Sequence, residues 1–393
     1  MRYFKRLEDG SLATIGGRFG KGSHAPSAAK SYDEVFTDGF FVSGMLLITL
    51  QSTQIAMAQP GHLWMLAAAF FAIARGQAYI TAREIFVLTI FICTTIVCTY
   101  FQDFGRVKAA EQIFKFGLIY PGFYFVGRWL GTIYSARQLP LGYKYLFGLL
   151  AIQFIVQLLA IPLLYHELNF AEGALHGTFK ERNWLALYFL MFSYFIFLKS
   201  RSTRAFAIFI ILNGIVALLS GSKTAFVGCG IIFLIHGRTN IGLKAVALIM
   251  GAAFYWWIFA NDLSADQLAV RTETERGLAF SYAIDLIREN PFGHGVGFVE
   301  WFFGQKAEVI MGLGAGTNSV FCTPLDLMII AGGAGLLLWL FIFLGVGLGA
   351  VSILLPIAIL SLLNPLHQSE LVYFFIGMLV SASAFMKKKD RAV

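Results

Sequence analysis

Apolar runs of close to 20 residues recur along most of the chain, separated by short polar or glycine-containing stretches. That length is what an α-helix needs to cross the hydrocarbon core of a bilayer. The pattern predicts an all-α polytopic membrane protein with about twelve transmembrane helices. We expect them near 39–58, 62–80, 84–102, 113–134, 145–165, 183–199, 204–220, 223–236, 243–260, 323–344, 346–363 and 371–386.

Lysines and arginines concentrate in alternate connecting stretches, which the positive-inside rule assigns to the cytoplasm. With twelve spans, both termini fall on that side, including the C-terminal KKKDR at 387–391. The opposite, outer side receives the stretches 103–112, 166–182, 220–223 and 261–322. Because 261–322 is much longer than an ordinary connection, we expect it to be functional.

These boundaries give a predicted domain organisation. It comprises a cytoplasmic N-terminal tail (1–38), transmembrane helices one to nine (39–260), a large outer loop (261–322), transmembrane helices ten to twelve (323–386) and a cytoplasmic basic tail (387–393). No apolar segment precedes residue 39, so we expect no cleaved signal peptide.

Composition supports the membrane interpretation. The 393 residues are 58% hydrophobic and only 13% charged, about half the charged fraction of a typical soluble domain. The net charge of +8 lies largely at the ends and in short loops, as expected for cytoplasmic anchoring rather than nucleic-acid binding. The four cysteines form no CxxC pair, and we expect neither a metal site nor a disulfide framework.

The large outer loop contains an amphipathic segment and a glycine-rich turn. Residues 278–289, LAFSYAIDLIRE, carry apolar side chains at helical spacing and predict a helix lying on the membrane or on the bundle. The following GHGVGF at 293–298 is not a dinucleotide fingerprint, because no strand precedes it. After an Asn-Pro turn, Gly293 and Gly295 instead predict a tight loop that permits close backbone approach.

Cations gather on the predicted outer side, and each has two interpretations. Lys223 is either a lysine that reaches the membrane interface or a fixed cation at the mouth of a cavity. Arg271 and Arg276 belong either to a solvated helical turn or to a phosphate site, for which a guanidinium is suited. Arg182 and Asn183 begin a span on the same side and are further substrate-binding candidates.

Two charges fall inside predicted spans. A charge within the membrane is a functional candidate by default, so Lys115 and Arg128 qualify, although both could lie close enough to a helix end to reach water.

Established catalytic motifs are absent from the sequence: it contains no HExxH, GxSxG or Walker pattern, and no DxD pair occurs on the outer loops. What remains is a set of outer cations with candidate bases, namely His294, Glu300, Asp326 and His176. Cations stabilise a departing negative charge, and a base deprotonates a hydroxyl. The combination suits a donor with a diphosphate leaving group.

The order of these segments resembles the O-antigen ligase and polymerase superfamily, which includes Wzy-type bacterial exopolysaccharide polymerases. The resemblance covers residues 177–345 and rests on GTFKERNWLALYF, LSGSKTAFVG, ERGLAFSYAIDLIRENPFGHGVGF and TNSVFCTPLDLMIIAGGAGLLLWLF. It implies a GT-C-like, metal-independent glycosyltransferase without cofactors in the bacterial inner membrane, with the outer loop in the periplasm. The implied donor is a polyprenyl-diphosphate-linked oligosaccharide. Implied partners are membrane lipids and a chain-length regulator and flippase of the same pathway.

The resemblance also suggests roles for individual residues. Lys223 falls at a position where the family carries arginine, and Arg276 falls on the arginine ahead of the loop helix. Together they are expected to bind the diphosphate, assisted by Arg271 and Arg182. Asn318 would orient a sugar or phosphate. The sequence departs from the ligases at Thr317-Asn318, where these commonly carry His-Asn.

Three functions remain open on this basis. The leading hypothesis is a polymerase that joins lipid-linked repeat units on the periplasmic face, with His294 or Asp326 as the base and the 293–297 turn shaping the sugar site. The second is a ligase that transfers finished glycan to an acceptor. The third is a flippase for lipid-linked sugar, a class that usually shows an internal repeat, whereas the two halves of this chain show no clear repeat.

Overall fold

The computed structural model describes residues 31–53, 58–77, 80–102, 106–167, 173–200, 202–236, 241–259, 274–310 and 318–390. The chain divides into two units, Met1–Asp38 and Gly39–Val393. In the first unit, only the start of one helix belongs to the described residues. The second unit holds the other helices.

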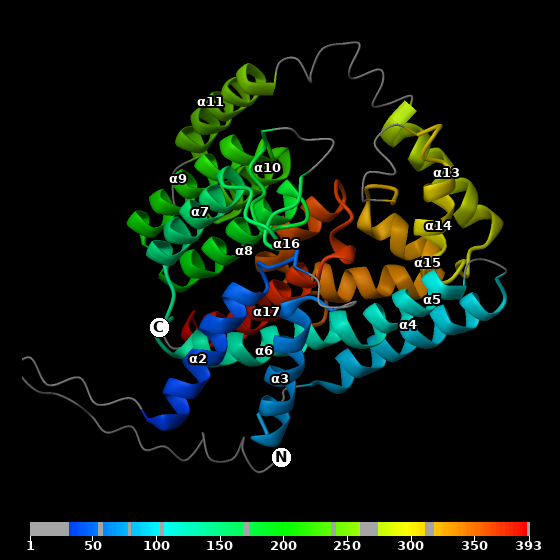
Figure 1. Cartoon of the computed structure of the whole chain (residues 1–393), viewed down its shortest axis with the longest axis horizontal. Coiled ribbons are helices and arrows are strands. Elements are labelled where there is room, and N and C mark those ends of the chain that lie inside the picture. The colour runs from blue at the N-terminus through cyan, green and yellow to red at the C-terminus, as the bar shows by residue number, and fades with distance from the viewer. Residues whose placement is uncertain are drawn as a thin grey trace, which may run out of the picture. The chain divides into compact units, whose positions relative to one another are not determined.

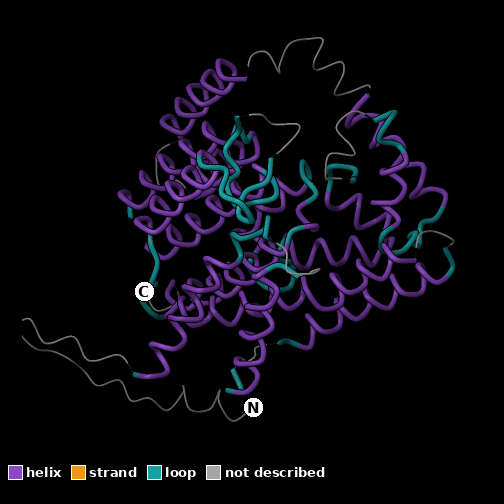
Figure 2. Tube along the Cα trace, viewed as in Figure 1, coloured by secondary structure: helices purple, strands orange, loops and turns teal. Residues whose placement is uncertain are grey.

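The described residues fold into helices joined by loops and contain no β-strand (Figure 2). In chain order the elements are α2 (Tyr32–Leu47), α3 (Pro60–Ala74), α4 (Ala82–Tyr100), α5 (Arg106–Phe114), the π-turn η1 (Lys115–Ile119), α6 (Tyr120–Ala136), α7 (Tyr143–Leu158), α8 (Arg182–Ser200), α9 (Thr203–Ser220), α10 (Lys223–His236), α11 (Ile241–Phe259), α13 (Arg276–Glu289), α14 (Phe298–Gln305), α15 (Thr323–Leu338), the π-turn η4 (Trp339–Phe343), α16 (Val351–Ser361), the 3₁₀ turn η5 (Leu366–Gln368) and α17 (Glu370–Asp390).

Each span expected from the sequence overlaps a helix of the structure, which confirms the all-helical fold class. Four helices within the described residues are long and apolar enough to cross a membrane: Ala82–Tyr100, Arg182–Ser200, Thr203–Ser220 and Thr323–Phe343. The remaining apolar helices are shorter or carry polar residues. The total of twelve crossings, the cytoplasmic termini and a GT-C-like arrangement stay predictions. The loop helix expected at 278–289 is α13.

Helices α6 and α17 pack against each other more extensively than any other pair of described elements (Figure 1). Gly127 and Gly131 lie one turn apart on α6, where a Cβ would collide with the backbone of Phe374 and Met378. A Cβ on Gly377 of α17 would likewise collide with the backbone of Tyr124. Small residues at this spacing let two helices in an apolar environment approach closely and gain van der Waals contact. The neighbouring α8 is almost entirely buried.

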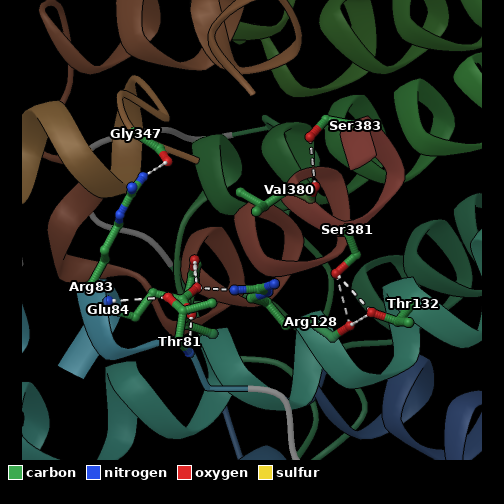
Figure 3. A network of polar contacts seen from close by, with 10 residues as sticks. Thr81, Arg83, Glu84, Arg128, Thr132, Gly347, Val380, Ser381 and Ser383 are labelled. Carbon is green, nitrogen blue, oxygen red and sulfur yellow. Dashed lines mark hydrogen bonds and ion pairs between the residues drawn. The ribbon is translucent and has the colours of Figure 1, made fainter. Parts of the chain in front are cut away.

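A buried polar network joins the start of α4 to the middle of α6 (Figure 3). Thr81 caps α4 by accepting a hydrogen bond from the Glu84 amide, and the Glu84 carboxylate accepts one from the Thr81 amide at 2.8 Å. The same carboxylate, which is fully buried, accepts hydrogen bonds from Tyr124 at 2.6 Å and from Arg128. The Glu84 side chain therefore both caps α4 and pairs with an arginine on another helix.

The helix α15 is interrupted at Ala331 and Gly332, whose backbone leaves the helical region. The interruption frees carbonyl groups that need partners. The amides of His294 and Gly295 donate to Ile329 and Ile330 at 2.7 and 2.9 Å. Gly293 has a φ of +104°, and a Cβ there would lie 2.5 Å from the Ile330 carbonyl. The glycine turn thus docks on α15 and replaces its missing hydrogen bonds.

Candidate functional site

The corner between α9 and α10 sets the position of Lys223. Helix α9 ends at Gly221, which adopts a left-handed φ of +59°. Ser222 then accepts a hydrogen bond from the Ala225 amide at 3.4 Å, a capping interaction for α10. Its own hydroxyl donates to Asn183 at 3.0 Å, which ties this corner to the first turn of α8. Lys223 is consequently held at the first position of α10.

Beside this corner lies a cavity of about 200 Å³, which we call the cation cavity. Residues from α8, the α9–α10 corner, α13 and the segment after α16 line it: Arg182, Asn183, Gly221, Lys223, Thr224, Glu275, Arg276 and Asn364. Four of these, Arg182, Asn183, Lys223 and Arg276, are residues that the sequence singled out. The fold brings them together from segments up to about 90 positions apart along the chain.

Arg276 begins α13 and is held at the cavity wall by backbone and aromatic contacts. Its guanidinium donates to the Leu363 carbonyl at 3.2 Å and lies 5.5 Å from the centre of the Phe321 ring. Gly221, which also lines the cavity, leaves room for Arg182, since a Cβ there would lie 3.3 Å from its Nη1. Thr224 donates to Asn364 at 3.1 Å and fixes the amide that completes the lining.

The electrostatics of the cation cavity favour an anion. Three basic side chains and one carboxylate line its described part, a formal excess of two positive charges. The N-terminus of α10 adds backbone amides and the positive end of a helix dipole, both of which favour phosphate. Two guanidinium groups can also form paired hydrogen bonds to phosphate oxygens. The arrangement is chemically suited to bind a phosphate or diphosphate group.

A second and larger cavity, of about 320 Å³, also borders the start of α8. We call it the amide cavity, because five amide side chains line it together with carboxylates, lysines and aromatic rings. Its lining consists of Gln51, Gln59, Glu111, Gln112, Lys115, Tyr120, Lys180, Glu181, Trp184, Glu300, Asn318, Gln368, Ser369 and Glu370. Asn318, predicted as a substrate-binding residue, belongs here rather than to the cation cavity.

Sequence reasoning missed most of the amide cavity. Gln51, Gln112 and Gln368 are single uncharged residues in three distant segments, and they belong to no motif. Only their nearness to the ends of apolar runs could have drawn attention to them. Lys115, singled out as a charge inside a span, lines this cavity and pairs with Glu111 at 2.6 Å.

Other predicted residues lie outside the described lining of both cavities. Gly293, His294 and Gly295 belong to the turn docked on α15, where His294 is buried, stacks on Phe298 and donates to the Leu286 carbonyl at 3.0 Å. Arg271 and Thr317 fall outside the described residues. The role of His294 as a base stays a prediction. So does the role of Gly293 and Gly295 in shaping the sugar site.

Asp326 is fully buried in the first turn of α15. Its Oδ1 accepts a hydrogen bond from the Val320 amide at 2.9 Å. Its Oδ2 lies 3.9 Å from Nδ1 of His367, which is too far for a hydrogen bond. Burial lowers the pKa of His367 to about 3, so at neutral pH the imidazole is uncharged and the two side chains form no ion pair.

His176, the remaining candidate base, is buried in the loop before α8. Its Nδ1 lies 3.1 Å from the Phe179 carbonyl, and burial lowers the pKa of its imidazole. Among the described residues, no group of three or more His, Cys, Asp or Glu side chains could hold a metal ion.

The start of α8 and the two residues before it border both cavities. Lys180, Glu181 and Trp184 line the amide cavity, whereas Arg182 and Asn183 line the cation cavity. Consecutive Cα atoms are about 3.8 Å apart, so Arg182 and Trp184 lie within about 7 Å of each other at their Cα atoms. Both cavities therefore border the same short segment of the chain. The chain matches no protein-family model, and no curated protein shows significant similarity to it.

Proposed function

We propose that this protein is a membrane glycosyltransferase that polymerises polyprenyl-diphosphate-linked oligosaccharide repeat units into exopolysaccharide or O-antigen on the periplasmic face of the bacterial inner membrane. The observation that carries this proposal is the convergence of Arg182, Lys223 and Arg276 on one cavity with excess positive charge. The order of sequence segments that resembles the O-antigen ligase and polymerase superfamily provides independent support.

In this function the cation cavity binds the diphosphate of the donor lipid. Charge-assisted hydrogen bonds from Arg182 and Arg276 orient the two phosphates, and Lys223 contributes a third positive charge. As the glycosidic bond forms, the lipid diphosphate departs with additional negative charge. Fixed cations that act on this charge accelerate the step, and removal of one such group typically costs about 10²- to 10³-fold in rate.

The reaction needs a base for the attacking sugar hydroxyl. His294 and Asp326, the bases that the sequence favours, are buried away from the described lining of the cation cavity. We therefore assign them no step. Glu300, which the sequence also offers, lines the amide cavity and is the preferred candidate for a base.

The test uses full-length protein in lipid nanodiscs with a radiolabelled polyprenyl-diphosphate repeat unit, and products are separated on a gel. We expect a ladder of multiples from the wild type and an initial rate at least about 100-fold lower from Arg276→Ala. Arg288→Ala is the matched control, because Arg288 lies on the same helix with its side chain 77% exposed.

Each result is decisive. A ladder that persists unchanged in Arg276→Ala would remove the cation cavity from the mechanism. A wild type that forms no ladder but transfers glycan once to an added lipid A core acceptor would indicate the ligase alternative. A wild type that only moves intact donor across the bilayer would indicate the flippase alternative.

A further inference from the structure

The amide cavity is lined mostly by polar side chains. Gln51, Gln59, Gln112, Asn318 and Gln368 place five side-chain amides around it, and Ser369 adds a hydroxyl-bearing residue. Gln112 and Gln368 come from α5 and from the η5 turn, so distant segments contribute to this lining. An amide side chain offers both hydrogen-bond donors and an acceptor. The lining therefore suits a ligand that supplies several donors and acceptors.

The charge of the amide cavity excludes a second phosphate. Four carboxylates and two ammonium groups line its described part, a formal excess of two negative charges. Burial also lowers the pKa of Lys180, so the lysine holds its proton less tightly than an exposed one. An anionic ligand would be repelled here, in contrast to the cation cavity. The favoured ligand is uncharged and rich in hydroxyl groups.

Sugar hydroxyls both donate and accept hydrogen bonds, as amide side chains do. The apolar faces of a sugar ring can also pack on an aromatic side chain, and Trp184 offers one at the cavity wall. The volume of about 320 Å³ falls within the usual range for small-ligand pockets. The adjacent residues Glu181 and Arg182 line the amide cavity and the cation cavity respectively, so both cavities border the start of α8.

We propose that the amide cavity binds the sugar attached directly to the diphosphate of the donor lipid, and that it selects an uncharged sugar there. This inference rests on the proposed function, because it places the diphosphate in the cation cavity. Gln112 and Gln368 hydrogen-bond to the hydroxyls, and the start of α8 contacts both parts of the ligand.

The test measures dissociation constants of three probes for the full-length protein in nanodiscs. The probes are polyprenyl diphosphate, the same lipid carrying one neutral hexose, and the same lipid carrying one hexuronic acid. We expect the neutral hexose to tighten binding by at least about tenfold relative to the bare lipid, since each neutral hydrogen bond contributes about 0.5–1.5 kcal/mol. The hexuronic acid should give no such gain.

The variant Gln112→Ala/Gln368→Ala should lose most of the gain from the hexose and bind the bare lipid as the wild type does. Unchanged affinity for the bare lipid also shows that the variant is folded. Arg276→Ala should weaken the binding of all three probes. Gln305→Ala, at an exposed position on α14, is the matched control and should change nothing.

Three results would overturn the inference. If the bare lipid binds through Arg276 but the hexose adds no affinity, the amide cavity is not a sugar site and the proposed function stands. If the gain survives in the double glutamine variant, the sugar binds elsewhere. If the wild type binds neither lipid, both the inference and the proposed function fail.

Discussion

Arg128 and Arg276 illustrate two opposite uses of an arginine in the same helical protein. Arg128 lies within α6 with its side chain 15% exposed, and it pairs with the fully buried carboxylate of Glu84 (Figure 3). Arg276 begins α13 and lines a cavity together with two other cations. The first arginine is neutralised by its own fold, whereas the second belongs to a group with excess charge.

The difference shows how a buried charge should be interpreted. From the sequence, Arg128 is a functional candidate because charges within a membrane are costly. In the structure it completes a network with Glu84, Tyr124 and Thr81, so its charge is balanced without any ligand. Three cations and one carboxylate line the cation cavity, so its net positive charge attracts an anion. Stability is therefore expected to depend on the Glu84–Arg128 pair, and ligand binding on the cation cavity.

The largest expected effect concerns the Glu84–Arg128 pair. Replacement of Glu84 by Ala leaves Arg128 as an unpaired buried charge and should lower the free energy of unfolding by about 3–5 kcal/mol. Thermal unfolding of the purified protein in detergent measures this loss. The double variant Glu84→Ala/Arg128→Met removes both charges and should recover most of the stability. A Glu84→Ala variant that unfolds at the wild-type temperature would contradict a structural role for the pair.

An intermediate effect is expected for the cation cavity. Lys223→Met should weaken the binding of polyprenyl diphosphate by about tenfold or more, because a hydrogen bond to a charged group contributes about 1.5–3 kcal/mol. Lys223→Arg should retain affinity, since arginine keeps the charge and can form paired hydrogen bonds to phosphate. Both variants should unfold near the wild-type temperature, unlike Glu84→Ala. Equal affinity in Lys223→Met and wild type would remove Lys223 from the site.

The smallest expected effect is a dependence of the folding stability on pH, which we assign to His367. His367 is buried and uncharged in the folded state, where its pKa is about 3, against about 6.5 in the unfolded chain. Between these values the unfolded state binds more protons, so stability is complete above pH 6.5 and decreases as the pH falls. From pH 7 to pH 5.5 the expected loss is about 1 kcal/mol.

Melting temperatures at pH 7 and pH 5.5 measure the contribution of His367. The variant His367→Gln should flatten the difference between the two pH values, provided that it is folded at pH 7. Asp326, at 3.9 Å, is the acidic group that the structure places against this imidazole. An equally steep decrease in His367→Gln would assign the pH dependence to other groups.

Much of the fold could be predicted from local patterns. The helix predicted at 223–236 matches α10, Lys223–His236, at both ends, because a Gly-Ser corner precedes it and the apolar run then continues. The bounds predicted for the span at 113–134 were less accurate. There the structure has one continuous helical stretch from α5 through the π-turn η1 to α6, and this stretch starts at Arg106. Polar residues such as Glu111 and Gln112 hid its first turns from a search for apolar runs.

The candidate site was predictable only in part. Arg182, Lys223 and Arg276 could be singled out because cations at the ends of apolar runs are conspicuous, but nothing local indicates that they meet. The glutamines of the amide cavity left no pattern in the sequence. The break in α15 was also hidden, because Ala331-Gly332 looks like ordinary small residues within an apolar helix.

The sequence by itself determined the helical segments, their apolar character and the supply of basic residues, because these follow from the types of neighbouring residues and their spacing. Only the tertiary structure decided which charges are neutralised. Glu84 meets Arg128 across 44 positions, whereas Arg182, Lys223 and Arg276 line a common cavity from three separate helices. Helix packing brings such distant residues together, and no periodicity within one helix encodes these contacts.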